Sequence, residues 1–167
     1  IPVSKVWPHG TPDLVITLPE ITVPATGAVD FKYTCVDLAL EEDRWISAVS
    51  YSIGELSVLH SLVVNATLES THNSLEGSDP MAGSEFLSLY VPGRTADEFP
   101  ENSGFLLKKG ANLIVKSRYL SSGRETSDIT QLGFYFLKSQ PEYSLHSLTL
   151  ENTDFLVPAN DANYQVD

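Results

Sequence analysis

The sequence contains very little cysteine, since Cys35 is the only one among its 167 residues. A single thiol cannot form a disulfide within the chain, and it excludes the paired-cysteine motifs of zinc ribbons, iron–sulfur clusters and thioredoxin-type enzymes. Long hydrophobic runs are also missing, because no stretch approaches the roughly 18 consecutive apolar residues of a membrane-spanning helix. No transmembrane segment is therefore expected. The chain begins at Ile1 without a methionine and shows no signal peptide, as expected of a processed or trimmed form.

Basic residues are scarce as well. The chain carries 10 Lys and Arg against 22 Asp and Glu, which gives a formal net charge of -12 with histidine neutral. A nucleic-acid partner is not expected, since such proteins need basic surface to displace counterions. The same deficit argues against docking on anionic lipid. The hydrophobic share of 42% is nonetheless high enough for a packed core, so one domain over residues 1–167 is expected.

No segment carries a sustained helical period, and short alternating runs take its place. Prolines punctuate the first 30 residues, which predicts an extended proline-rich arm over residues 1–13 rather than a helix. About nine apolar or alternating segments follow, at residues 14–18, 31–36, 45–51, 57–68, 86–91, 104–107, 112–120, 131–137 and 145–150. This spacing is typical of an all-β protein with an antiparallel β-sandwich, in jelly-roll form.

The segments between these runs predict irregular structure. Residues 69–84 and 92–103 are polar and contain glycine and proline, which favours loops. Residues 41–44 are suited to one helical turn, and residues 158–167 form a polar C-terminal tail that is expected to be loose. No internal repeat or low-complexity segment is present, which favours a single sandwich.

His60 lies in a run, residues 58–64, that otherwise has the composition of a buried strand. A neutral imidazole on a core strand needs a partner for each ring nitrogen. A metal ion is one such partner, and a backbone carbonyl is another. The residues alone leave both interpretations of His60 open.

The arm carries a second histidine close to a tryptophan. Trp7 and His9 are two residues apart, so in an extended chain their side chains point to the same side. Pro8 fixes the backbone between them, and Gly10 allows the chain to bend away. Such an arm can bring one imidazole and one indole to a single site, or Trp7 can pin the arm to the sandwich with His9 exposed.

The other candidate residues give weaker signals. His72 lies in a polar loop and His146 falls outside the alternation of its leucine neighbours, so both are expected to face solvent. Met81, the only methionine, is either a soft ligand or an ordinary loop residue. No nucleophile-elbow, HExxH or P-loop motif is present. Calcium bound by the acidic loops is a further expectation, although the sequence does not indicate which residues would be its ligands.

Several segments resemble the peptidylglycine-monooxygenase-like copper domain. They are residues 10–15, 19–20, 23–27, 42–49, 58–61 and 107–113, within a likeness that runs from about residue 6 to about residue 137. The resemblance implies an antiparallel jelly roll that holds copper on two histidine-bearing strands. The chain departs from this pattern, because Ser61 follows His60 and residues 116–119 contain no histidine. Most of the histidines that bind copper in the enzymes are therefore missing, so an enzyme is not expected.

The Trp7-Pro8-His9 arm is similar to a narrower family, the MopE/CorA-type copper proteins of methane-oxidising bacteria. The resemblance implies a secreted protein associated with the outer cell surface that binds copper(I) for copper uptake. In that family the ion is held by two histidines and by the oxygen of a kynurenine formed from tryptophan. Carried over to this chain, the implied ligands are His9, His60 and Trp7 as kynurenine. The implied partners are the copper ion and a copper-uptake partner or the outer cell surface.

Two other functions compete with this interpretation. One is a reduced copper-dependent monooxygenase-like enzyme, which would need further ligands such as Met81 or His72. The other is a metal-free β-sandwich interaction module that binds a protein or glycan through tyrosines such as Tyr90, Tyr119 and Tyr135.

Overall fold

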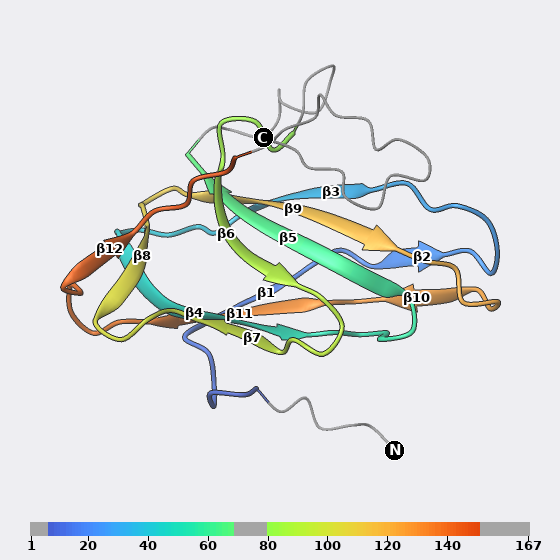
Figure 1. Cartoon of the computed structure of the whole chain (residues 1–167), viewed down its shortest axis with the longest axis horizontal. Coiled ribbons are helices and arrows are strands. Elements are labelled where there is room, and N and C mark those ends of the chain that lie inside the picture. Colours follow the sequence, from blue (N-terminus) through green and yellow to red (C-terminus); the bar gives the residue numbers. More distant parts are fainter. Residues whose placement is uncertain (1–6, 69–79, 151–167) are drawn as a thin grey trace, which may run out of the picture.

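The computed structural model describes residues 7–68 and 80–150, and these residues form two packed β-sheets with no helix among them (Figure 1). The larger sheet has the strand order β1 (Leu14–Thr17), β11 (Gln131–Phe136), β4 (Arg44–Ser52), β8 (Ser103–Leu107) and β12 (Tyr143–Leu145), and β7 (Ala96–Glu98) also pairs with β4. The four-stranded sheet has the order β3 (Lys32–Asp37), β9 (Asn112–Tyr119), β5 (Leu59–Thr67) and β6 (Glu85–Tyr90). A small separate pair joins β2 (Ile21–Val23) to β10 (Thr126–Asp128).

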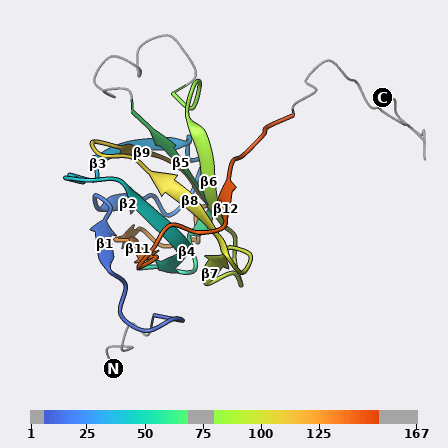
Figure 2. The same ribbon diagram turned by 90° about the vertical axis from the view of Figure 1, so that its left-hand side faces the viewer.

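The predicted β-sandwich is confirmed. The view turned by 90° shows the four-stranded sheet stacked above the six-stranded sheet (Figure 2). All strand pairs are antiparallel except β12 with β8, which is parallel. The jelly-roll connectivity stays a prediction. In the described part of the chain no helix is long and apolar enough to cross a membrane.

The core lies between the two sheets because alternate side chains of the central strands point inward. Leu62 and Val64 of β5 and Leu132 and Phe134 of β11 belong to this core, and all four are fully buried. Burial of such a side chain contributes about 1.5–3 kcal/mol each. The remaining residues of these strands look outward, so each sheet also presents an outer face on which functional groups can be placed.

Three expectations about individual segments are wrong. Residues 145–150 do not form a strand, since β12 ends at Leu145 and the following leucines, Leu148 and Leu150, are exposed. Residues 41–44 form a bend instead of a helical turn, because Asp43 accepts a hydrogen bond from the backbone N–H of Lys109 and β4 has already begun at residue 44. The predicted loop at 92–103 contains the short strand β7.

Asp97 links the two sheets through a buried hydrogen-bond network. Its carboxylate, on β7, accepts hydrogen bonds from the Ser88 hydroxyl at 2.5 Å and from the backbone N–H of Leu89 at 3.0 Å, both on β6. Arg94 forms an ion pair with the same carboxylate, and Ser88 also contacts the Tyr51 hydroxyl. Burial raises the pKa of Tyr51 well above its usual value near 10.

Asp128 makes a second buried network near the start of β5, where Tyr119 pairs with Leu59. Its carboxylate accepts hydrogen bonds from the Glu55 N–H at 2.7 Å, the Tyr119 hydroxyl at 3.0 Å and the Thr130 hydroxyl at 2.8 Å. Burial, with the nearby carboxylate of Asp128, raises the pKa of Tyr119 well above its usual value. Gly54 is required beside this network, since a Cβ atom there would lie 2.6 Å from the backbone nitrogen of Ile129.

Candidate metal centre

The N-terminal arm docks on the outer face of the six-stranded sheet through Trp7. A Cβ atom on Gly133 of β11 would lie 2.9 Å from the indole atom Cζ3 of Trp7 and 2.6 Å from Cγ of Pro12. The indole and the proline ring therefore rest directly on the backbone of a central strand, which only glycine allows. Trp7 pins the arm to the sandwich, as one of the two sequence interpretations expects.

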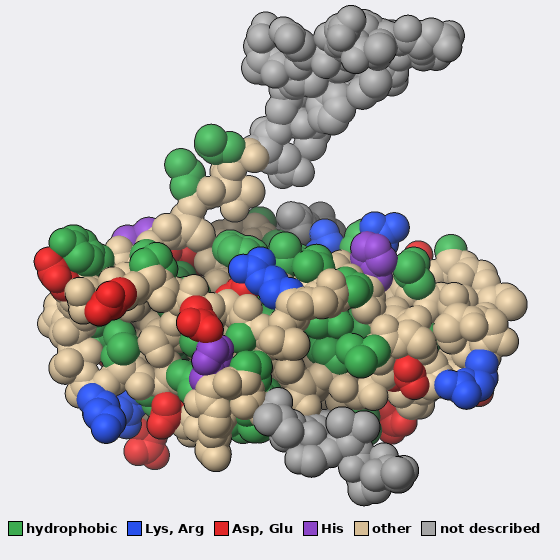
Figure 3. All heavy atoms as spheres, turned by 60° about the horizontal axis from the view of Figure 1, so that its bottom comes forward, with side chains coloured by type: hydrophobic (Ala, Val, Ile, Leu, Met, Phe, Trp, Pro, Cys, Tyr) green, Lys and Arg blue, Asp and Glu red, His purple; other side chains and the backbone are tan. Residues whose placement is uncertain are grey.

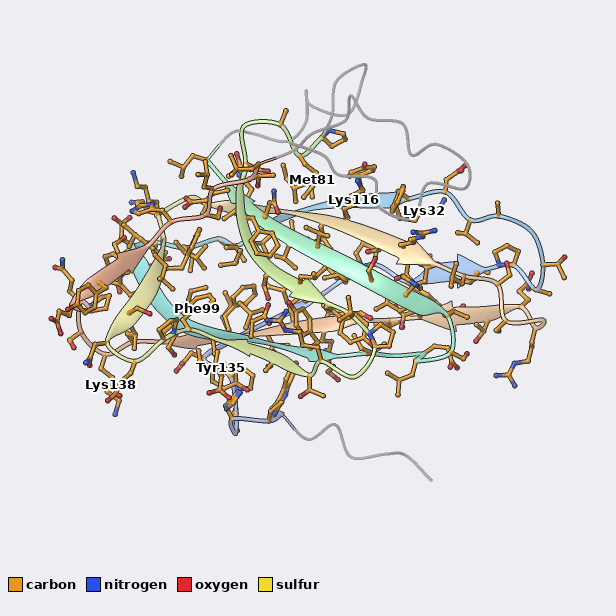
Figure 4. The ribbon with its side chains drawn as sticks, in the orientation of Figure 1. Lys32, Met81, Phe99, Lys116, Tyr135 and Lys138 are labelled. Atoms are coloured by element: carbon orange, nitrogen blue, oxygen red, sulfur yellow. The ribbon has the colours of Figure 1, made fainter. Side chains whose placement is uncertain are left out.

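Tyr135 holds the turn that carries His9. Its neighbour Phe134 is fully buried, so the Tyr135 side chain points to the other side of β11, toward the arm (Figure 4). The Tyr135 hydroxyl donates a hydrogen bond to the backbone carbonyl of Gly10 at 3.0 Å and accepts one from the Ser50 hydroxyl at 3.3 Å. The N–H of Gly10 bonds back to the Trp7 carbonyl at 3.3 Å. The turn over residues 7–10 is thereby fixed against the sheet.

His9 lies beside this tyrosine and beside a carboxylate. Its ring meets the Tyr135 ring edge-on, with the ring centroids 5.5 Å apart at 88°. Its Nε2 atom is 3.1 Å from Oε1 of Glu98 on β7, and its side chain is 31% exposed. Trp7 and His9 thus reach the same outer face, but through the turn over residues 7–10 and not through the extended backbone that the sequence prediction assumed. The imidazole is oriented by a carboxylate and remains open to solvent, an arrangement suited to a metal ligand.

His60 has a different environment from the one expected. It falls between Leu59, which pairs with Tyr119, and Ser61, which pairs with Arg118, so it is the extra residue of a β-bulge in β5. Leu59 is buried, whereas His60 is exposed. The expectation of a buried strand histidine is wrong, because the bulge turns the side chain to the solvent side of the four-stranded sheet.

The structure does not bring His9 and His60 together. His9 contacts β7 and β11 of the six-stranded sheet, and His60 lies on β5 of the four-stranded sheet. Packed sheets are about 10 Å apart, whereas a metal–imidazole bond is about 2 Å long. On the face of the molecule shown in Figure 3, the histidine side chains do not gather in one cluster. In this arrangement the set of His9, His60 and an oxidised Trp7 does not fit one ion.

The donors beside His9 are of a different kind. Glu98 supplies a carboxylate, whereas the indole of Trp7 has only an N–H donor and cannot ligate a metal. Within residues 7–68 and 80–150 no group of three or more His, Cys, Asp or Glu side chains is arranged around a common point. The chemically competent unit is therefore the His9–Glu98 pair, with water or a further group completing a coordination shell.

The remaining candidates lie elsewhere. The His146 side chain is 74% exposed, as expected, with Nδ1 3.3 Å from Oε1 of Glu85. Met81 is half-buried in a turn before β6, and its carbonyl accepts a hydrogen bond from the Ser84 hydroxyl at 2.5 Å. His72 and the tail over residues 158–167 fall outside the described residues.

The outer face of the four-stranded sheet carries stacked cations. Nζ of Lys116 lies 4.5 Å from the Phe31 ring centroid and 5.6 Å from that of Tyr33, and Cζ of Arg118 lies 5.8 Å from the Phe31 centroid. Figure 4 places Lys116 on the opposite side of the molecule from Tyr135. The tyrosines that were expected to bind a partner are not part of this outer face. Tyr90 and Tyr119 are buried in the core, where they cannot meet a partner.

Sequence reasoning missed three residues of the arm site. Glu98 fell in an expected loop, Gly133 lay inside an expected strand, and Tyr135 was considered only for a partner surface. A glycine in the middle of a strand pattern is a signal for close approach of another group. Nothing in the sequence near residue 98 connects it with the arm, because β7 meets the arm only through the fold.

No known family model matches this sequence, and no curated protein matches it. The resemblance to copper proteins therefore stays a prediction, and the functional argument rests on the geometry of the arm.

Proposed function

We propose that the protein binds one copper ion at its N-terminal arm and takes part in copper acquisition at a cell surface, with His9 as the anchoring ligand. The observation that supports the proposal is the joint position of Trp7 and His9 on one outer face, beside Glu98. Imidazole nitrogen is a good ligand for copper, and a carboxylate is a suitable second donor for its oxidised form. The uptake role and the secreted, surface-associated location rest on the sequence resemblance alone.

Each residue of the arm has a distinct role in this proposal. His9 donates a ring nitrogen to the ion, and Glu98 either ligates the ion or orients the imidazole. Trp7 forms an apolar wall that slows the entry of water and oxidant. If dioxygen oxidises Trp7 to N-formylkynurenine and water then releases the formyl group as formate, the kynurenine carbonyl oxygen becomes a third donor at the same place. No catalytic turnover is part of the proposal.

His60 is the second imidazole that the resemblance implies, and two imidazoles would favour copper(I) over copper(II). In the described structure it can share an ion with His9 only if the arm leaves its place on Gly133. The two donor sets, His9 with Glu98 and His9 with His60, therefore predict different responses to mutation.

Competition with a copper(I) chelator under anaerobic conditions tests the proposal, with copper(II) titrated in parallel. His9→Ala should lower the affinity at least about a hundredfold, because it removes the one imidazole common to both donor sets. His146→Ala is the matched control, since it removes an exposed histidine far from the arm, and it should leave the affinity unchanged.

The other two variants identify the second ligand. A loss of affinity in Glu98→Gln with none in His60→Ala supports the pair seen in the structure. The reverse result means that the arm moves to form the two-histidine site. Unchanged copper binding in His9→Ala would overturn the proposal. An intact mass raised by roughly 4 Da would identify oxidation of one of the two tryptophans, Trp7 and Trp45, and its absence from Trp7→Phe would assign it to the arm.

A further inference from the structure

A cavity of about 340 Å³ lies at one end of the sandwich, away from the arm. It opens where β5 ends, β6 begins and β8 turns into β9. Its lining includes Ala66 and Glu85 from the four-stranded sheet, Phe105 and Leu107 from β8, and Lys108 and Ala111 from the following turn. The volume is at the lower end of the range of about 300–1,000 Å³ that is typical of small-molecule sites.

The inner wall of the cavity is apolar. Phe105, Leu107 and Ala111 belong to the hydrophobic core and are almost fully buried, and Ala66 lies beside them at the edge of the core. Two of these residues are alanines, so their small side chains leave the space that larger residues would fill. An apolar body that enters this space is removed from water, which is the main driving force for binding.

The polar groups at the cavity mouth are not equivalent. The carboxylate of Glu85 accepts a hydrogen bond from the Ser147 N–H at 3.1 Å and lies 3.3 Å from Nδ1 of His146. Lys108 is exposed, and the described residues give its ammonium group no ion-pair partner. The Glu85 carboxylate thus already has partners, whereas the Lys108 ammonium group is available to pair with a ligand. A ligand that combines an apolar body with one negative charge complements this mouth.

The segment after β12 passes the mouth of the cavity, because the Ser147 backbone is hydrogen-bonded to the lining residue Glu85.

We infer that the cavity binds a small amphipathic anion, with its apolar body among Ala66, Phe105 and Ala111 and its charged group paired with Lys108. This site is independent of the proposed copper site, since none of its residues belongs to the arm. The chemistry that it recognises is a carboxylate or sulfonate on an aromatic or aliphatic body of modest size.

Two probes that share an apolar body test the inference. Anilinonaphthalene sulfonate carries the charge, and N-phenylnaphthylamine has the same rings without it. Fluorescence titration of the full chain should show one saturable site for each probe, and the sulfonate should raise the melting temperature of the folded protein. Saturation at one equivalent separates this site from non-specific adsorption.

Substitutions at the mouth and in the wall separate the charge from the apolar contacts. Lys108→Gln should weaken the sulfonate about fivefold, the effect of one partly exposed ion pair, and leave the neutral probe unchanged. Lys109→Gln removes the neighbouring charge, which does not line the cavity, and should change neither probe. Ala66→Leu fills the cavity and should weaken both probes at least about fivefold.

The inference is overturned if neither probe binds saturably. It is also overturned if Lys108→Gln and Lys109→Gln weaken the sulfonate equally, since that would report only net charge. Should Ala66→Leu prevent folding, the two lysine variants still decide the question. Copper binding is expected to be the same in all three variants, so failure here and failure of the copper proposal are distinguishable.

Discussion

The two histidines singled out by the sequence are both exposed, but they differ in their contacts. His9, on an arm outside the sandwich, is held by Glu98 and Tyr135. His60, in the middle of an apolar run, is exposed on a β-bulge. The arm histidine is ordered by groups distant in sequence, and the strand histidine is turned outward by one extra residue. Tertiary contacts, rather than local hydrophobicity, decide which imidazole is prepared to bind a ligand.

The region around His60 depends on Asp128, and Asp128→Ala gives the largest expected effect. Its carboxylate accepts three hydrogen bonds, including one from Tyr119, which pairs with Leu59 at the start of the bulge. Removal leaves buried donors without acceptors and should lower the free energy of unfolding by about 3 kcal/mol. Urea unfolding measures the loss. Asp30→Ala, at an exposed position, should change stability by less than about 0.5 kcal/mol, and equal losses would contradict the assignment.

The region around His9 depends on Gly133. Gly133→Ala places a methyl group where Trp7 and Pro12 rest, so the arm must lift from the sheet. We expect a loss of about 2 kcal/mol in unfolding free energy and a red shift of the Trp7 emission, measured with Trp45 replaced by Phe. Gly123→Ala, at an open position with φ of +83°, tests backbone strain alone. An arm that stays docked in Gly133→Ala would contradict the packing described.

Alkaline pH should weaken the His60 end of the sandwich through Tyr119. The raised pKa of the folded tyrosine means that above pH 10 the unfolded state loses the phenolic proton while the folded state keeps it. Stability from this group is therefore present below pH 10 and falls above it, with a slope that approaches about 1.4 kcal/mol per pH unit once the unfolded-state tyrosine is ionised. Tyr119→Phe should reduce the loss of unfolding free energy between pH 10 and pH 11 by about 1 kcal/mol. An unchanged slope would contradict the burial of the hydroxyl.

The smallest expected effect is that of Tyr135→Phe on the arm. The substitution removes the hydrogen bond to the Gly10 carbonyl but keeps the ring that His9 contacts. We expect a loss of about 1 kcal/mol or less in stability and faster hydrogen exchange at the Gly10 amide. Tyr33→Phe, on the other outer face, should leave that exchange rate unchanged. Equal exchange in the two variants would mean that Tyr135 does not hold the turn.

Much of the fold could be predicted from the sequence because its long strands alternate clearly. The central strands β4, β5, β9 and β11 were expected within two residues of their observed ends. The three-residue strands β2, β7 and β10 were missed, since three residues cannot display an alternation. Residues 145–150 alternate without being a strand, because the chain pairs with β8 only at Tyr143–Leu145 and then leaves the sheet.

The candidate site could be predicted only in its local part. The sequence pointed to Trp7 and His9 as neighbours on one side of an extended arm, whereas the structure brings both to one face through a turn that Tyr135 holds. The contribution of Glu98 depends on how β7 pairs with β4 and could not be predicted from its surroundings in the sequence. The bulge at His60 was also invisible, since a bulge depends on the register of β5 against β9.

The most direct test of the account is native mass spectrometry of the copper-loaded protein, which counts the ions retained by each intact chain. One copper per chain is expected in the wild type and in His146→Ala, and none in His9→Ala at the same copper concentration. Circular dichroism should show the same β-spectrum for all three proteins, because His9 lies outside the core. A folded His9→Ala protein that retains one copper ion would contradict the placement of the metal on the arm.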